Sequence, residues 1–221
     1  MIAKRQVSAL RNIPVFTTEF GVASLILESV AARKEAYVRI QSSLEPIKLI
    51  EECVAFCKAC GAEKVYATGH EALESYPLHT SVLQMNADRS AVGETDAMLF
   101  PLQEQTAARW RGIYNEAMMT VDNAAWMSER AIKELIADGS GYFVHRDGKL
   151  LGIGKASGDR IDAVVSSVRG MGAEVVRALA HALSSDTVTI EVAATNRRAV
   201  SLYERLGFVK TKELSRWYKI F

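Results

Sequence analysis

Two glycines stand where a β-branched segment runs into an amphipathic segment, in the stretch VSSVRGMGAEVVRALAHAL (165–183). Glycine adopts positive φ and lets the backbone approach a ligand closely. The N-terminus of a helix also offers free N–H groups and a positive dipole end, which favour phosphate. Gly170 and Gly172 therefore predict a pyrophosphate-binding loop, although an ordinary strand-to-helix turn uses the same glycines. The stretch has neither the third glycine of a dinucleotide fingerprint nor the G-K-S/T of a P-loop.

An acidic residue interrupts the next β-branched segment, TVTIEV (187–192), in which apolar and polar residues alternate. A strand that is covered on both faces is almost wholly apolar. Glu191 must therefore face a polar cavity or a charged partner. It is a candidate general base beside the predicted phosphate loop, and the alternative is an ion-paired or partly exposed strand residue.

Two further polar residues follow this segment. Asn196 stands where the strand ends and the next helix begins, a position typical of an N-cap. Tyr203 shares a helical stripe with Val200 and Leu206, which is compatible with simple packing of the ring.

Three cysteines, Cys53, Cys57 and Cys60, form a C-x3-C-x2-C run. One interpretation is a metal site completed by His70 or His79. Spacings of four and seven, however, place all three thiols on one stripe of a helix, and free cysteine behaves as a small buried hydrophobe. The run matches no standard zinc spacing, so it favours core packing and no metal.

The composition limits the classes of function. The 221 residues are 49% hydrophobic and 24% charged, with a formal net charge of +1. Lysines and arginines are scattered, which argues against nucleic acid as a partner. No apolar run approaches the roughly 20 residues that cross a bilayer, and the first residues lack the apolar core of a signal peptide. We expect a cytoplasmic protein without a membrane partner, and the sequence is compatible with a homodimer.

The second half of the chain predicts a mixed sheet with helices on both faces. Its hairpin turn is predicted at Asp147-Gly148. The expected elements are a strand at 97–102, helices at 104–119 and 128–139, a hairpin at 141–157, a strand at 160–168, a helix after Gly172, a strand at 187–195, a helix at 197–207 and a final pair of strands within 208–221.

The first half contains a weak internal repeat. Val65–Tyr76 aligns with Val192–Tyr203 at a constant offset of 127 residues, with identical residues at five positions. We therefore predict a degenerate domain at 1–93, a polar linker at Asn86–Asp96, and the main domain at 94–221. At the same offset Lys64 takes the place of Glu191, and Ser43 and Glu45 take the places of Gly170 and Gly172, so we expect no cofactor site in the first half.

The segment TIEVAATNRRAVSLYERLGF (189–208) resembles the N-x-x-A-x-x-L-Y-E-x-x-G-F signature of the GNAT N-acetyltransferase superfamily. The glycine stretch is similar to the acetyl-CoA motif of that family, Q/R-x-x-G-x-G/A. The resemblance extends from about Ala97 to Phe221. It implies an α/β (α+β) fold, a GNAT-like mixed central sheet with helices on both faces, preceded here by a smaller degenerate GNAT-like domain.

The motif can be aligned in two frames. A start at Arg169 puts Glu174 where the family has a small residue, whereas a start at Ser167 lacks the initial Gln or Arg. The second frame places apolar residues on the core positions of the helix, so we adopt it. Glu174 can then point to solvent, and the departure from the family is the short side chain of Ser167, part of whose role Arg169 could take.

The resemblance implies an acetyl-CoA-dependent N-acetyltransferase, which transfers acetyl to a primary amine by direct attack in a ternary complex. The acceptor is a small molecule or a protein amino group. Glu191 would be the general base, Tyr203 would protonate the leaving thiolate, and Asn196 would position the pantetheine arm. The residues expected to bind acetyl-CoA are Val164, Val165, Ser167, Val168, Arg169, Gly170, Met171, Gly172, Ala173, Asn196 and Tyr203.

Two other functions stay open at this point. A GNAT-like module can bind acyl-CoA in a regulatory or interaction role without catalysis. A redox or metal protein built on the cysteines is the third and weakest reading.

Overall fold

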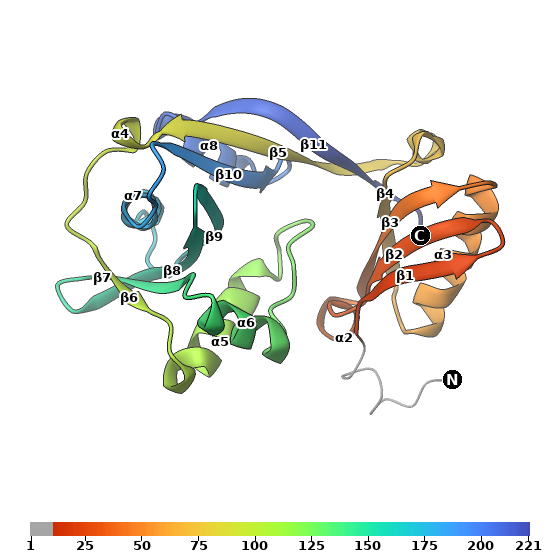
Figure 1. Cartoon of the computed structure of the whole chain (residues 1–221), viewed down its shortest axis with the longest axis horizontal. Coiled ribbons are helices and arrows are strands. Elements are labelled where there is room, and N and C mark those ends of the chain that lie inside the picture. Colours follow the sequence, from red (N-terminus) through yellow and green to blue (C-terminus); the bar gives the residue numbers. More distant parts are fainter. Residues whose placement is uncertain (1–10) are drawn as a thin grey trace. The chain divides into compact units, whose positions relative to one another are not determined.

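The computed structural model describes residues 11–221 and divides them into two compact units (Figure 1). Unit 1 comprises residues 11–81 and 215–221, and unit 2 comprises Val82–Leu214. The predicted boundary at 93/94 therefore falls inside unit 2. The expected linker is instead the end of a strand followed by a short helix, whose Val92 is buried in the core of unit 2. The first ten residues, to which the signal-peptide expectation refers, lie outside the described residues.

Unit 1 is a small sheet with one long helix. Strands β1, β2 and β3 are antiparallel neighbours, and α3 connects β3 to the parallel strand β4. The end of the last strand of the chain, β11, pairs antiparallel with β4. The elements are β1 (Ile13–Thr18), β2 (Gly21–Ile26), α2 (Val30–Arg33), β3 (Glu35–Ser43), α3 (Pro46–Ala59), β4 (Lys64–Thr68) and the 3-10 helix η1 (Glu71–Ser75).

The cysteine stripe belongs to the core of unit 1. Helix α3 begins with Pro46, whose fixed φ suits the first helical position. Its buried face includes Cys53 and Cys57, and Cys60 follows at the C-cap. All three thiols are free and buried in the same apolar cluster. Among the described residues no group of His, Cys, Asp or Glu could hold a metal ion.

Unit 2 is a larger mixed sheet in the order β11-β5-β10-β9-β8-β7-β6. Strands β9 and β10 are parallel and are connected through α7. The neighbouring pairs β5–β10, β8–β9, β7–β8 and β6–β7 are antiparallel. The elements are β5 (Leu78–Asp88), α4 (Arg89–Val92), β6 (Met98–Pro101), the 3-10 helix η2 (Glu104–Thr106), α5 (Ala107–Met118), α6 (Glu129–Ala137), β7 (Gly141–Arg146), β8 (Lys149–Ser157), β9 (Arg160–Ser166), α7 (Gly172–His181), β10 (Thr187–Ala193), α8 (Arg197–Arg205) and β11 (Val209–Lys219).

Helices cover the two faces of this sheet through different apolar clusters. Helices α7 and α8 pack on one face, with Ile161 and Ile190 beneath them. Helices α5 and α6 pack on the other face around the fully buried Trp110, whose Nε1 donates to Tyr142 O at 3.0 Å. Helix α7 approaches the sheet closely because β8 carries glycine there, and a Cβ at Gly154 would collide with Leu179.

Most expected elements of unit 2 are present, with one clear difference. Asp147 and Gly148 form the predicted hairpin turn, both with positive φ. The expected final pair of strands is instead the single strand β11 of 11 residues. Residues 208–221 contain no Gly, Pro, Asn or Asp, and Ser215 is the one residue of a type that favours turns.

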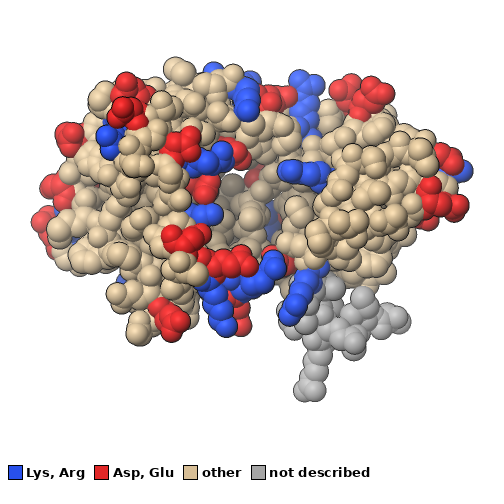
Figure 2. Space-filling view, in the orientation of Figure 1, with Lys and Arg blue, Asp and Glu red and all other residues tan. Residues whose placement is uncertain are grey.

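Charges of both signs are interspersed over the face of the molecule shown in Figure 2. Within residues 11–221, no helix combines the length and the apolar character needed to cross a membrane.

Candidate functional site

The parallel strands β9 and β10 separate soon after they meet. Arg160 pairs with Thr189 and Ile161 pairs with Ile190, and these two strands form no further pair in the sheet. At the same place β9 has a bulge, because Ala156 pairs with Ile161 and Lys155 with Ala163. Asp162 is the extra residue, and a bulge bends a strand and changes its local direction. The two strands thus diverge and leave backbone groups of β9 without a partner from β10.

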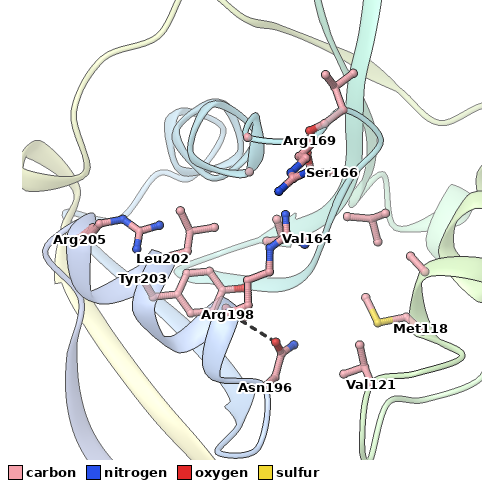
Figure 3. A pocket seen from close by; sticks show the side chains of 16 residues that line it. Met118, Val121, Val164, Ser166, Arg169, Asn196, Arg198, Leu202, Tyr203 and Arg205 are labelled. Atoms are coloured by element: carbon pink, nitrogen blue, oxygen red, sulfur yellow. Dashed lines mark hydrogen bonds between the residues drawn. The ribbon is translucent and has the colours of Figure 1, made fainter.

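A cavity of about 290 Å³ opens where the strands diverge (Figure 3). The second half of β9 and the following loop form one wall, α8 forms another, and the end of α5 closes the third side. Figure 3 shows Met118 and Val121 across the cavity from Asn196 and Arg198. The lining includes no residue of β10, so the cavity lies beside the end of β9, between the start of α7, the helix α8 and the end of α5.

The predicted glycine loop lines this cavity at the start of α7. Gly170 has φ +86°, a conformation that favours glycine, and Gly172 is the first residue of the helix. The N-cap residue, Met171, makes no side-chain cap hydrogen bond. Because the first N–H groups of a helix have no acceptor within the helix, this end of α7 can donate to an anion in the cavity.

Three arginines surround the same space. Arg169 lies on the loop, and Arg198 and Arg205 lie two turns apart on α8. The 16 lining residues include no Asp or Glu. None of these three guanidinium groups forms an ion pair with another residue that the structure describes. The cavity is therefore strongly positive in a chain whose net charge is only +1.

Tyr203 reaches the cavity from α8 but is only 7% exposed. Burial raises the pKa of its hydroxyl to about 12, because the charged phenolate is poorly solvated there. The ring lies 5.8 Å from the ring of Phe208. The phenol is thus held in its protonated form at the edge of the cavity.

Asn196 is the N-cap of α8, as expected. Its Oδ1 accepts from Ala199 N at 3.2 Å and so caps α8. The residue also lines the cavity, and in Figure 3 its amide nitrogen points away from the capping bond.

Comparison with known proteins gives the fold. Residues 166–218 match the model of the FR47-like protein family. A GCN5-related N-acetyltransferase from Kribbella flavida aligns with a TM-score of 0.59 at 10% identity, over 92% of this chain and 58% of that one. A tandem GNAT protein from the clavulanic acid biosynthesis pathway aligns with a TM-score of 0.52 at 14% identity, over 98% and 86% of the two chains. The chain has a GNAT fold. The predicted fold class is thereby confirmed.

A third solved structure, a GCN5-related N-acetyltransferase from Anabaena variabilis, aligns at 12% identity with a TM-score of 0.57, over 84% of this chain and 54% of that one. No curated protein matches the sequence. The GNAT fold of this chain is therefore known from structural likeness and from the family model of its C-terminal segment.

The structure brings most of the predicted residues of the GNAT site together. Those that line the cavity are Val164, Val165, Val168, Arg169, Gly170, Gly172, Asn196 and Tyr203. Ser167, Met171 and Ala173 belong to the same loop and helix start but do not line the cavity. Ser167 N donates to Leu151 O at 2.8 Å, which fixes the backbone of the loop.

Glu191 stands apart from the cavity. It follows Ile190, the last residue of β10 that pairs with β9, and it faces the side of the sheet opposite α7 and α8. Its Oε1 lies 2.5 Å from a terminal nitrogen of Arg160, and about two fifths of each side chain is exposed. The ion-paired alternative for Glu191 describes the contact that the structure contains.

Glu174 does not point to solvent as expected. Its carboxylate accepts from Thr95 Oγ1 at 2.7 Å and from Arg177 at 2.6 Å. These bonds tie the first turn of α7 to the segment before β6 and direct the acid away from the glycine loop.

Several lining residues were missed by the sequence analysis. Arg198, Leu202 and Arg205 lie on one stripe of α8, since the spacings of four and seven place side chains on one helix face. That spacing was a usable signal. Met118 and Val121 gave no signal, because only the tertiary fold brings the end of α5 to β9.

Proposed function

We propose that unit 2 is an N-acetyltransferase that uses acetyl-CoA and acts on a primary amine. The observation that carries the proposal is the cavity beside the part of β9 that no longer pairs with β10, with a helix N-terminus and three arginines but no acid in its lining. Coenzyme A is a long ligand with phosphates at one end, and this cavity combines a helix N-terminus and three arginines with the edge of β9 that has no strand partner. The GNAT fold supports acetyl transfer in general.

The residues present fit the parts of acetyl-CoA. The start of α7 and Arg169 would hold the diphosphate, with Arg198 and Arg205 adding positive charge. The unpaired edge of β9 around Val164 and Val165 offers main-chain groups to the pantetheine amides and to the thioester carbonyl. Asn196 lies on the opposite wall. The bound cosubstrate supplies an activated acetyl group.

Proton transfer by this chain would use two residues. The acceptor amine arrives as an ammonium with a pKa near 10 if it is like lysine, so it must lose a proton before attack. Glu191 would take that proton through a bridging water, since it lies near the junction of the strands but outside the cavity lining. Tyr203, protonated and at the cavity wall, would return a proton to the sulfur as the C–S bond breaks and the N–C bond forms.

One observation favours a second candidate, a module that binds acyl-CoA without catalysis. Glu191 is engaged by Arg160 and does not reach the cavity. The carboxylate must leave this ion pair before it can accept a proton from an amine.

The decisive experiment measures binding and turnover on the same proteins. Calorimetric titration should give one coenzyme A site per chain, because β3 and β4 of unit 1 stay paired over five positions and form no gap. In Glu191→Gln and Tyr203→Phe, thiol release with an accepted amine should fall about 10²–10⁴-fold while coenzyme A binding persists. If coenzyme A does not bind to the wild-type protein, both candidate functions are wrong. If coenzyme A binds but turnover is the same in wild type, Glu191→Gln and Tyr203→Phe, the two residues do not have the proposed catalytic roles.

A further inference from the structure

A row of four charged side chains crosses the face of the sheet in unit 2 that is opposite α7 and α8. Lys155 Nζ lies 3.2 Å from Asp162, Arg160 Nε lies 3.4 Å from the same Asp162, and Arg160 reaches Glu191 at 2.5 Å. The row thus runs from β8 through β9 to β10 with alternating sign. Each side chain is about one third or more exposed, so the row is open to a ligand.

The two acids of the row stand where β9 and β10 begin to diverge. Asp162 follows Ile161, and Glu191 follows Ile190, the two residues of the last backbone pair. Arg160 contacts both acids and therefore bridges the junction. Val164, two residues beyond Asp162, already lines the cavity, so the row adjoins the place where the acyl group would emerge.

Neutral and acidic groups also lie near Glu191 on this face. Gln84 of β5 pairs with Glu191 in the sheet register, and its Nε2 donates to Asn86 at 3.2 Å. Asp159 accepts from Thr189 Oγ1 at 3.3 Å. Among the described residues, Arg160 is the cation that forms an ion pair with Glu191, and Lys155 pairs with Asp162.

The charges of the row constrain the acceptor. Two cations and two anions are balanced without a ligand. An ammonium that binds Glu191 brings a second positive charge beside Arg160, whose guanidinium already shares Asp162 with Lys155. An acceptor that carries its own carboxylate next to its amine removes this conflict, because a guanidinium binds a carboxylate in bidentate geometry.

We propose that the acceptor is a free amino acid, whose amine takes the place of Arg160 at Glu191 and whose carboxylate binds Arg160. The assignment rests on the proposed acetyltransferase function and names its substrate class. Arg160 is then a substrate-binding residue, which releases the carboxylate of Glu191 and binds the carboxylate of the amino acid. A peptide or protein N-terminus, which has no adjacent carboxylate, is the competing acceptor.

The test compares each of the twenty standard amino acids with its carboxamide, which has nearly the same shape but no negative charge. With wild-type protein and acetyl-CoA we expect kcat/KM to favour at least one amino acid over its amide by about 10–100-fold, mainly through KM, as for a charged hydrogen bond. In Arg160→Gln this ratio should fall to near one, and Arg160→Lys should retain part of it. Arg109→Gln, which removes an exposed arginine of α5, should keep the wild-type ratio.

The failures are distinguishable. If amides, amines or peptide N-termini are acetylated as well as amino acids, or if the preference survives in Arg160→Gln, the acceptor assignment is wrong and the acetyltransferase function stands. The assignment is also wrong if coenzyme A binds but no amino acid is acetylated. Absence of coenzyme A binding to wild type overturns the proposed function itself. The wild-type comparison needs no variant, so a folding defect in Arg160→Gln leaves the assignment testable.

Discussion

In unit 2 the first residue of α7, Gly172, lies against Leu202 of α8, and a Cβ at Gly172 would stand 3.0 Å from Leu202 Cδ2. Both residues line the cavity. In Gly172→Ala the leucine must shift, and the added methyl narrows the space beside the phosphate loop. We expect KM for acetyl-CoA to rise about tenfold, equivalent to ~1.4 kcal/mol. The melting temperature should not fall, because alanine suits a helix better than glycine.

Gly170→Ala provides a matched contrast two residues away. A Cβ at Gly170 meets no atom within 4 Å, but φ is +86°. The cost is therefore backbone strain of about 1–2 kcal/mol, which thermal unfolding measures. We therefore expect Gly172→Ala to change mainly KM and Gly170→Ala to change mainly stability. Equal changes in KM and in stability for the two variants would contradict this expectation.

Tyr203 predicts a specific pH dependence of stability. Burial raises its pKa to about 12, above the value near 10 expected in the unfolded chain. Stability from a raised pKa is fully present below the unfolded pKa and is lost as the pH rises through the folded pKa. Between pH 10 and 12 the unfolded chain loses the phenolic proton while the folded chain keeps it. Wild type should therefore lose up to about 1.4 kcal/mol per pH unit relative to Tyr203→Phe.

Urea unfolding of wild type and Tyr203→Phe between pH 8 and pH 11 checks this prediction. Other buried groups, including the cysteine thiols, also titrate in this range, and subtraction of the variant removes their contribution. A difference in unfolding free energy that is constant with pH would show that the Tyr203 hydroxyl is as well solvated in the folded protein as in the unfolded chain.

Local patterns in the sequence were sufficient to predict that a glycine loop joins a strand to a helix and that Tyr203 lies on a helix, whereas the functions of these residues stay predictions. Gly170 and Gly172 are adjacent to the strand and helix that they connect, so one short stretch carries the signal. Tyr203 belongs to a segment in which spacing defines one helix face. The domain boundary was less accessible, because the polar side chains near Asn86 lie on a paired strand rather than in a linker.

Contacts between distant residues explain the rest. Nothing adjacent to Glu191 predicts Arg160, since the ion pair depends on the parallel register of two strands that are separated by α7. Glu174 likewise bonds to Thr95, far away in the sequence. The repeat hypothesis gains support from a shared order, three antiparallel strands and then a helical connection to a parallel strand in each unit. It stays a prediction, because η1 follows β4 where α8 follows β10.

The cysteines of α3 should report the unfolding of unit 1. Burial raises the pKa of both Cys53 and Cys57 to about 12 and raises that of Cys60, so almost no thiolate is present at pH 8. Iodoacetamide should leave native protein unmodified and label three thiols in urea, as mass spectrometry will show. Rapid labelling of native protein would mean that α3 opens locally without global unfolding.

The arginines of the cavity predict how coenzyme A affinity depends on charge and salt. Arg198 and Arg205 are exposed at the cavity and face no acid in its lining. Each substitution to Gln should raise the Kd for coenzyme A about tenfold, since a hydrogen bond to a charged group contributes ~1.5–3 kcal/mol.

The affinity of the wild-type protein for coenzyme A should also fall with added salt, because charges at such sites are screened over about 10 Å at 0.1 M. Calorimetry in 0.05 M and 0.5 M NaCl should show a smaller salt effect in each variant, whereas Arg109→Gln on the exposed side of α5 should match wild type. An equal loss of affinity in Arg109→Gln would show that the net charge of the chain, rather than the arginines of the cavity, attracts the phosphates.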